Sequence, residues 1–236
     1  MASLLDEVLG TQPSPATELV VATAVLALLV VTARPVWRYA RNIITIAHEG
    51  GHALVAVLVG RRLSGIRLHS DTSGLTLSRG KPRGLGMVLT LLAGYVAPSL
   101  LGLGGAALLA AGRITLLLWL AIALLLAVLI MVRNGYGFLA VLVTSAAVFA
   151  VSWFTDAAVQ ATFAYLGVWF LLVGGVRPVG ELQRLRWRGR SPESDADQLA
   201  RLTRVPGLAW VGLFGLVNLA ALVAGCLLLL PLPGPR

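Results

Sequence analysis

The sequence is poor in the residue types that build disulfide frameworks and soluble surfaces. It contains one cysteine, Cys226, which excludes disulfide frameworks and cysteine-based zinc sites. Charged residues make up 12% of the chain, whereas soluble domains carry about 25%. Histidine occurs three times and lysine once, as Lys81. The positive charge, which gives a net charge of +9, therefore comes almost entirely from arginine. The sequence has no basic amphipathic helix and no aromatic-basic surface, which argues against a nucleic-acid partner.

Apolar residues are abundant, at 58% of the chain, and the mean hydropathy is +0.87. Several apolar runs approach or exceed the roughly 20 residues that a helix needs to cross a bilayer. We therefore expect an all-α polytopic membrane protein, a single domain over 1–236 in contact with the lipid bilayer, with about six to seven transmembrane helices. The expected segments are 18–33, 42–60, 84–112, 114–132, 137–153, 157–175 and 207–230.

Two polar stretches interrupt the apolar runs. In 62–79 apolar and polar residues alternate on both sides of a four-residue turn at 71–74, which predicts a β-hairpin after the second helix. The stretch 177–206 is expected to be a polar loop, with a short helix capped by Ser194 or Asp195. Together 61–83 and 177–206 carry 13 Lys/Arg, against four in the opposite loops at 34–41 and 113, so the positive-inside rule places both in the cytoplasm.

The pentapeptide His48-Glu49-Gly50-Gly51-His52 lies inside the second apolar segment. On a helix, residues i and i+4 share a face, so both imidazoles can bind one Zn²⁺, with Glu49 placed to act as general base on an activated water. The two histidines lie roughly 10 and 13 Å from Arg41 and Arg61, near the middle of the membrane. Ionisable groups at that depth indicate a functional site, and the paired glycines predict close packing of a neighbouring backbone.

Catalytic zinc usually has three protein ligands, so a third residue must complete the pair of histidines. The remaining histidine, His69, is expected to be an exposed strand residue of the hairpin. The third ligand is then a carboxylate, and spacing alone does not choose among the available acids. These are Asp156, Glu181, Glu193, Asp195 and Asp197.

Several motifs occur in an order that resembles the site-2 protease family of intramembrane zinc metalloproteases, in particular its short bacterial M50B-like branch. The resemblance implies a Zn²⁺-dependent endopeptidase in the bacterial plasma membrane that cleaves transmembrane protein substrates. It also implies Asp195 as the third metal ligand, with Asp197 second and Asp156 a further alternative. The motifs are His48 to Leu54, Ser73 to Thr76, Ala93-Gly94-Tyr95 with Pro98, Val132-Arg133-Asn134, Ser194-Asp195-Ala196, Leu199 to Thr203, Pro206 and Trp210.

Two further roles and two alternatives follow from the residues. Asn134, in a polar break between apolar segments, is a candidate for orienting the substrate, and the hairpin at 62–79 offers an edge strand to an unwound substrate segment. The main alternative is a catalytically inactive membrane scaffold of the same fold that binds partner helices. A metal transporter is a third reading, although the chain has none of the internal repeats common in transporters.

Overall fold

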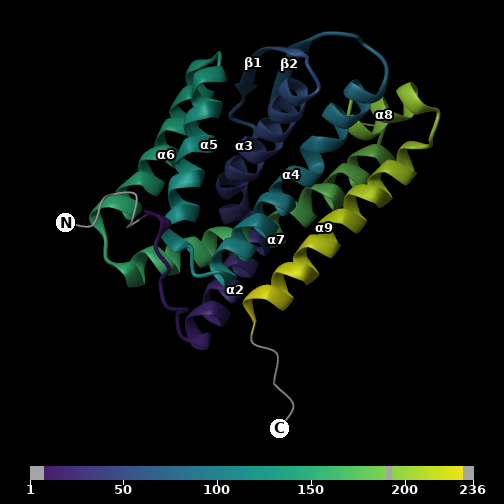
Figure 1. The fold of residues 1–236 in the computed structure, drawn as a ribbon. Helices are drawn as coiled ribbons and strands as arrows, with labels where there is room; N and C mark the ends of the chain where they lie inside the picture. The colour runs from purple at the N-terminus through teal and green to yellow at the C-terminus, as the bar shows by residue number, and fades with distance from the viewer. Residues whose placement is uncertain (1–7, 190–192, 231–236) are drawn as a thin grey trace.

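The computed structural model describes residues 8–189 and 193–230 (Figure 1). The chain forms long helices and one small hairpin, as the apolar pattern predicts. Helix α4 lies at the centre, against α3, α7 and α9, and the hairpin and α8 lie together at one end of these helices. The elements are α2 (Thr17–Thr32), α3 (Arg34–Leu58), β1 (Arg62–Leu68), β2 (Gly74–Arg79), α4 (Leu85–Ala110), α5 (Ile114–Met131), α6 (Gly135–Phe154), α7 (Ala157–Trp187), α8 (Asp195–Thr203) and α9 (Gly207–Leu229).

Five helices are long and apolar enough to cross a membrane, namely α4, α5, α6, α7 and α9. Helices α2 and α3 pass that test only as a pair, and they meet at a bend of 103°. Pro35 stands in the first turn of α3, where its fixed φ starts a new helix instead of continuing the previous one. The described residues therefore contain five candidate spans, or six if the bent pair is one span, which agrees with the lower end of the expected six to seven. That 18–33 and 42–60 are two separate crossings stays a prediction.

Helix α4 runs unbroken through Pro98 and agrees with the expected segment 84–112. One other boundary differs from the expectation. Helix α7 continues to Trp187, so the first third of the predicted loop 177–206 is helical. The apolar run ends near residue 175. The arginines, glutamate and leucines that follow are good helix formers, so the helix continues beyond the end of the apolar run. The short helix expected after Ser194 is confirmed, with the Ser194 hydroxyl accepting from Asp197 N.

The hairpin is antiparallel, and a bulge between Leu63 and Gly65 interrupts its register. The outer edge of β1 is covered by the α5–α6 connection. There Val132 forms a parallel bridge with Ile66, and Arg133 N donates to the Ile66 carbonyl at 2.8 Å. No strand of the described chain pairs with the outer edge of β2. The hairpin therefore has one covered edge and one open edge.

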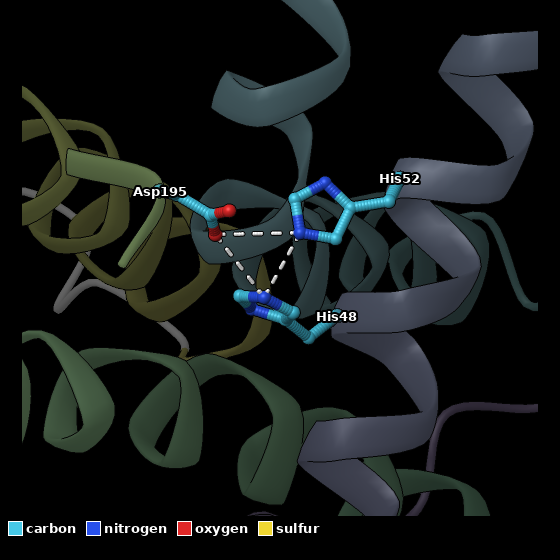
Figure 2. Close-up of side chains that lie close together, drawn as sticks. All are labelled: His48, His52 and Asp195. Atoms are coloured by element: carbon cyan, nitrogen blue, oxygen red, sulfur yellow. Dashed lines mark hydrogen bonds and ion pairs between the residues drawn. The ribbon is translucent and has the colours of Figure 1, made fainter. Parts of the chain in front are cut away.

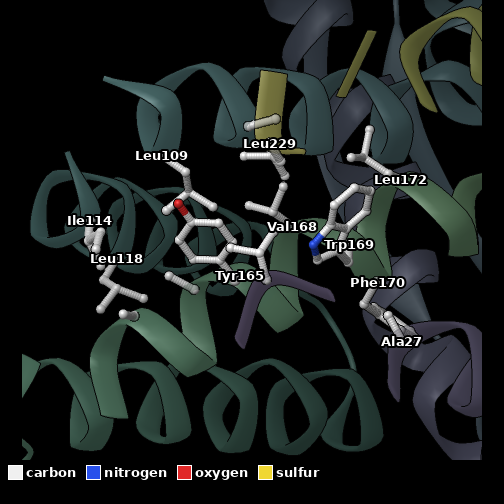
Figure 3. Packing of buried hydrophobic residues seen from close by; sticks show 14 of the residues in the cluster. Ala27, Leu109, Ile114, Leu118, Tyr165, Val168, Trp169, Phe170, Leu172 and Leu229 are labelled. Atoms are coloured by element: carbon white, nitrogen blue, oxygen red, sulfur yellow. The ribbon is translucent and has the colours of Figure 1, made fainter. Parts of the chain in front are cut away.

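Two of the three apolar clusters in the described residues fix the long helices and α8 around the site. The larger joins α2, α5 and α7, with Trp169 and Val168 of α7 at its centre (Figure 3). The smaller holds α8 against α4, α7 and α9 through Leu199, Phe214 and their neighbours, and both of these side chains are fully buried. Burying a leucine or phenylalanine contributes about 1.5–3 kcal/mol, so α8 is fixed by packing although it has only nine residues.

Candidate metal centre

The two motif histidines lie on one face of α3, one turn apart. Their Nε2 atoms are 3.1 Å from each other, and the rings meet edge to face with centroids 4.7 Å apart. His52 is buried, and the side chain of His48 is 21% exposed. The i,i+4 spacing therefore gives the convergence that the sequence predicts.

Asp195 approaches the histidines from the first residue of α8 (Figure 2). Its Oδ2 atom lies 3.3 Å from Nε2 of His48 and 3.3 Å from Nε2 of His52. The three donor atoms lie within 4.8 Å of one another, and in the part of the chain that the structure describes no other group of histidine, cysteine and acidic side chains does so. Residues 143 positions apart thus meet because α8 packs against α4.

The protonation pattern of the cluster suits a cation. The Nδ1 atom of His52 lies 2.7 Å from the Thr90 carbonyl, which can only accept, so the neutral ring carries its proton there. Its Nε2 lone pair then faces the Asp195 carboxylate. Without a cation between them, burial raises the pKa of Asp195, but the positive charge that His52 and His48 carry when they are protonated outweighs burial and lowers it. Lone pairs that face a carboxylate repel unless a cation or proton lies between them, and two imidazoles with a carboxylate are a common donor set for catalytic zinc.

Helix α4 approaches α3 closely at the histidines. A Cβ on Gly51 would overlap the Ala97 side chain and lie 3.0 Å from the Ala93 carbonyl. From the other side, a Cβ on Gly94 would overlap His52 and lie 2.7 Å from Cε1 of His48. The close packing expected from the paired glycines is present at Gly51. The space beside both imidazoles exists because residue 94 has no side chain.

Gly94→Ala is expected to weaken metal binding by the candidate site by more than about ten-fold, with zinc as the test ion, because the added methyl group must displace the His52 ring. Zinc bound per chain, measured against a competing chelator, gives the result. Alanine favours a helix more than glycine, so a loss cannot be attributed to helix propensity. Gly104→Ala is the matched control in the same helix, since a Cβ there meets nothing within 4 Å. Equal zinc affinity in the two variants would contradict the steric account.

Glu49 lies beside the cluster and is 4% exposed. The Thr76 hydroxyl, from β2, lies 2.6 Å from Glu49 Oε2 and can donate to it. A Cβ on Gly74 would overlap the same carboxylate, so a small residue is required where β2 passes it. The hairpin therefore holds the glutamate of the motif in place.

The other candidate acids lie elsewhere. Asp197 pairs with Nη2 of Arg186 at 2.9 Å, and the Ser194 hydroxyl lies 2.6 Å from its other oxygen. Asp156 caps the start of α7 and accepts from Val159 N at 3.0 Å, between α6 and α7. Asp197 thus anchors α8 to the end of α7, and Asp156 stabilises a helix terminus.

His69 and Asn134 are also placed outside the cluster. His69 is exposed just beyond β1, with Nδ1 3.3 Å from the Ser73 hydroxyl. The side-chain amide of Asn134 forms two hydrogen bonds with the backbone of Leu68. Asn134 Oδ1 accepts from the Leu68 N–H at 3.2 Å, and Asn134 Nδ2 donates to the Leu68 carbonyl at 2.6 Å. Asn134 therefore secures β1 and does not line the cavity, and its expected role in orienting a substrate stays a prediction.

A cavity of about 360 Å³ opens beside the cluster. One wall is a face of α3, another is β2 with its turn, and the third comes from α4 and the start of α8. The side chains that bear on its chemistry are Arg41, His48, Glu49, His52, Tyr95, Glu193 and Asp195.

Three residues that support the site were not predicted from the sequence, although Thr76 and Tyr95 lie within motifs of the family resemblance. They are Thr76, Thr90 and Tyr95, whose ring meets His48 edge to face at 4.8 Å and stacks on Phe214 at 5.0 Å. Each acts on the cluster from a segment distant along the chain. The nearest signal was the Ala93-Gly94-Tyr95 motif, which lies beside His48 in the fold.

Comparison with protein families identifies the family to which the chain belongs. The family model described as Peptidase M50B-like matches residues 21–225, which include α3 to α8 with the hairpin, most of α2 and α9, and the three-residue cluster. The chain therefore belongs to the Peptidase M50B-like family, an integral membrane branch of the M50 metallopeptidases. No curated protein and no solved structure matches it. Within this family, His48, His52 and Asp195 form a candidate metal site.

Proposed function

We propose that the chain is a zinc-dependent endopeptidase that hydrolyses peptide bonds of membrane-protein substrates. The observation that carries this proposal is the convergence of His48, His52 and Asp195 at one end of a cavity that also contains Glu49. His48 and His52 Nε2 and the Asp195 carboxylate would hold the zinc ion. When bound, zinc supplies Lewis acidity towards a water molecule and a peptide carbonyl.

Glu49 is the proposed general base. Its carboxylate is buried in the cavity wall, and the Thr76 hydroxyl near Oε2 orients it. Glu49 takes a proton from the attacking water and returns it to the leaving amine. The Thr90 carbonyl holds the Nδ1–H of His52, which keeps Nε2 facing the cavity.

The substrate is proposed to bind as an extended segment. A peptide bond in a helix has its carbonyl hydrogen-bonded, so a transmembrane substrate must unwind before it is cut. Residues of β2 line the cavity, and no described strand pairs with the outer edge of β2, so this edge is proposed to pair with an unwound segment through the main chain. Because the Asn134 amide and Val132 cover β1, β2 is the edge proposed to receive the substrate.

The cavity is proposed to open on the cytoplasmic side of a bacterial plasma membrane. Its walls include both β2 and residues 193–198, so the hairpin and the segment before α8 share one end of the molecule. The two polar stretches at that end carry most of the Lys/Arg, which the positive-inside rule assigns to the cytoplasm.

The proposal is tested with the purified chain in lipid nanodiscs and a single-span test protein. We expect a cut inside the span, located by mass spectrometry. We also expect cleavage to be lost when a chelator removes the metal, and restored when zinc is added in stoichiometric amount. A purified chain that retains no zinc and cuts nothing would instead favour the inactive scaffold.

A further inference from the structure

A second charged cluster lies on α3 and α7, two turns from the histidines. Two guanidinium groups, of Arg41 and Arg177, share a single carboxylate, that of Glu181. Arg177 is fully engaged. Its Nε donates to Glu181 at 2.9 Å, its Nη1 donates to the Val31 carbonyl, and its guanidinium lies 4.7 Å from the ring of Trp37. Trp37 Nε1 donates to the same glutamate oxygen at 3.0 Å.

Arg41 is held much more loosely. Its Nη1 lies 3.5 Å from the second oxygen of Glu181, well beyond the usual 2.9–3.0 Å of an N–H···O bond. Its side chain is 36% exposed and lines the cavity. With two arginines and one glutamate, the cluster keeps one positive charge in excess, and Arg41 presents it to the cavity.

The cavity does not supply a partner for that charge once the metal site is filled. A divalent cation would be balanced by Asp195 and Glu49. Glu193, the remaining acid of the cavity wall, pairs with Arg201 at 3.2 Å. A guanidinium in a partly desolvated wall binds a carboxylate strongly and with a defined geometry, since two parallel N–H···O bonds can form.

We propose that Arg41 forms a subsite for a carboxylate of the substrate, carried by an acidic side chain near the scissile bond. Arg41 precedes His48 by seven residues on one helix, a distance of about 10 Å. An extended peptide advances about 3.3 Å per residue, so the acid lies about three residues from the bond that is cut. This assignment rests on the proposed peptidase function and adds a substrate preference to it.

The test uses short internally quenched peptides of alanine and leucine with one variable residue: glutamate, glutamine or lysine. The variable residue is moved stepwise along both sides of the cut, and kcat/KM is measured for each peptide with the full chain. At a position about three residues from the cut, we expect glutamate to be preferred over glutamine by about ten- to hundred-fold, the range of a charge-assisted hydrogen bond. Arg41→Gln should abolish that preference, Arg41→Glu should transfer it to lysine, and Arg41→Lys should retain part of it.

Arg38→Gln is the matched control. Arg38 lies on the same helix, is exposed, and is outside the cavity wall, where it donates to the Tyr39 hydroxyl. It should leave the preference for glutamate unchanged. Equal cleavage of the glutamate and glutamine peptides at every position, or an unchanged preference in Arg41→Gln, would overturn the subsite.

A binding measurement separates this inference from the proposed function. Fluorescence anisotropy with the Glu49→Gln chain reports peptide affinity without cleavage, and the glutamate peptide should bind tighter than the glutamine peptide only while Arg41 is present. If the wild-type chain cuts no peptide but this difference in binding remains, the peptidase proposal fails and the Arg41 subsite stands. If cleavage occurs without any difference in binding, the subsite fails alone.

Discussion

Glu49→Gln is expected to reduce cleavage of a membrane substrate by about 10²–10⁴-fold while leaving bound zinc unchanged. Glutamine has nearly the same shape as glutamate and still accepts from the Thr76 hydroxyl, but it cannot take a proton from water. The three side chains that would bind the metal are untouched. The measurement is initial cleavage rate together with zinc per chain, in the same nanodisc preparation.

Glu18→Gln provides the control for this prediction. Glu18 is exposed in the first turn of α2, remote in sequence from the motif, so its neutralisation removes the same charge without entering the cavity. Its cleavage rate should equal that of the wild type. A Glu49→Gln chain that cleaves at an undiminished rate would remove Glu49 as the base.

Asp195→Asn is expected to lower zinc affinity by at least about 10–100-fold. Loss of a residue that only supports a ligand costs about that much, and this substitution removes a ligand itself. The amide keeps the size of the side chain, so the packing of α8 through Leu199 is preserved. Affinity is measured by competition with a chromophoric chelator, and helicity by circular dichroism confirms that the fold is intact.

Two other aspartates serve as controls for Asp195. Asp156→Asn changes a helix cap between α6 and α7 and should leave zinc affinity unchanged. Asp197→Asn weakens the contact with Arg186 that anchors α8, so its effect should be smaller than that of Asp195→Asn. If Asp197→Asn or Asp156→Asn released more zinc than Asp195→Asn, the assignment of Asp195 would be wrong.

The part of the site that local geometry determines could be predicted from the sequence. His48 and His52 share a helix face because four residues make about one turn, and that relation needs no tertiary structure. The hairpin at 62–79 could also be predicted, since the alternation of apolar and polar residues and the turn between them are local signals. Gly51 was predicted to mark a close approach, but the partner, Ala97 of α4, was not identifiable from the motif.

The remainder depended on contacts between segments distant in the sequence. Spacing could not choose Asp195 over Asp197, because the choice is made by the rotation of α8 against α4 and by the contact of Asp197 with Arg186. The bend between α2 and α3 could not be predicted, because hydropathy along the chain does not detect a change of helix direction before Pro35. From the sequence, Arg41 was predicted to lie in a charged loop. The structure places it in the cavity wall, beside Glu181 of α7.

We propose above all that His48, His52 and Asp195 together bind one zinc ion within the membrane domain. X-ray absorption at the zinc edge of the purified chain tests it most directly. We predict one zinc per chain, with nitrogen and oxygen neighbours at about 2.0–2.2 Å and the multiple-scattering signature of two imidazoles. A chain without zinc, a shell containing sulfur at about 2.3 Å, or a shell without imidazole would contradict the account.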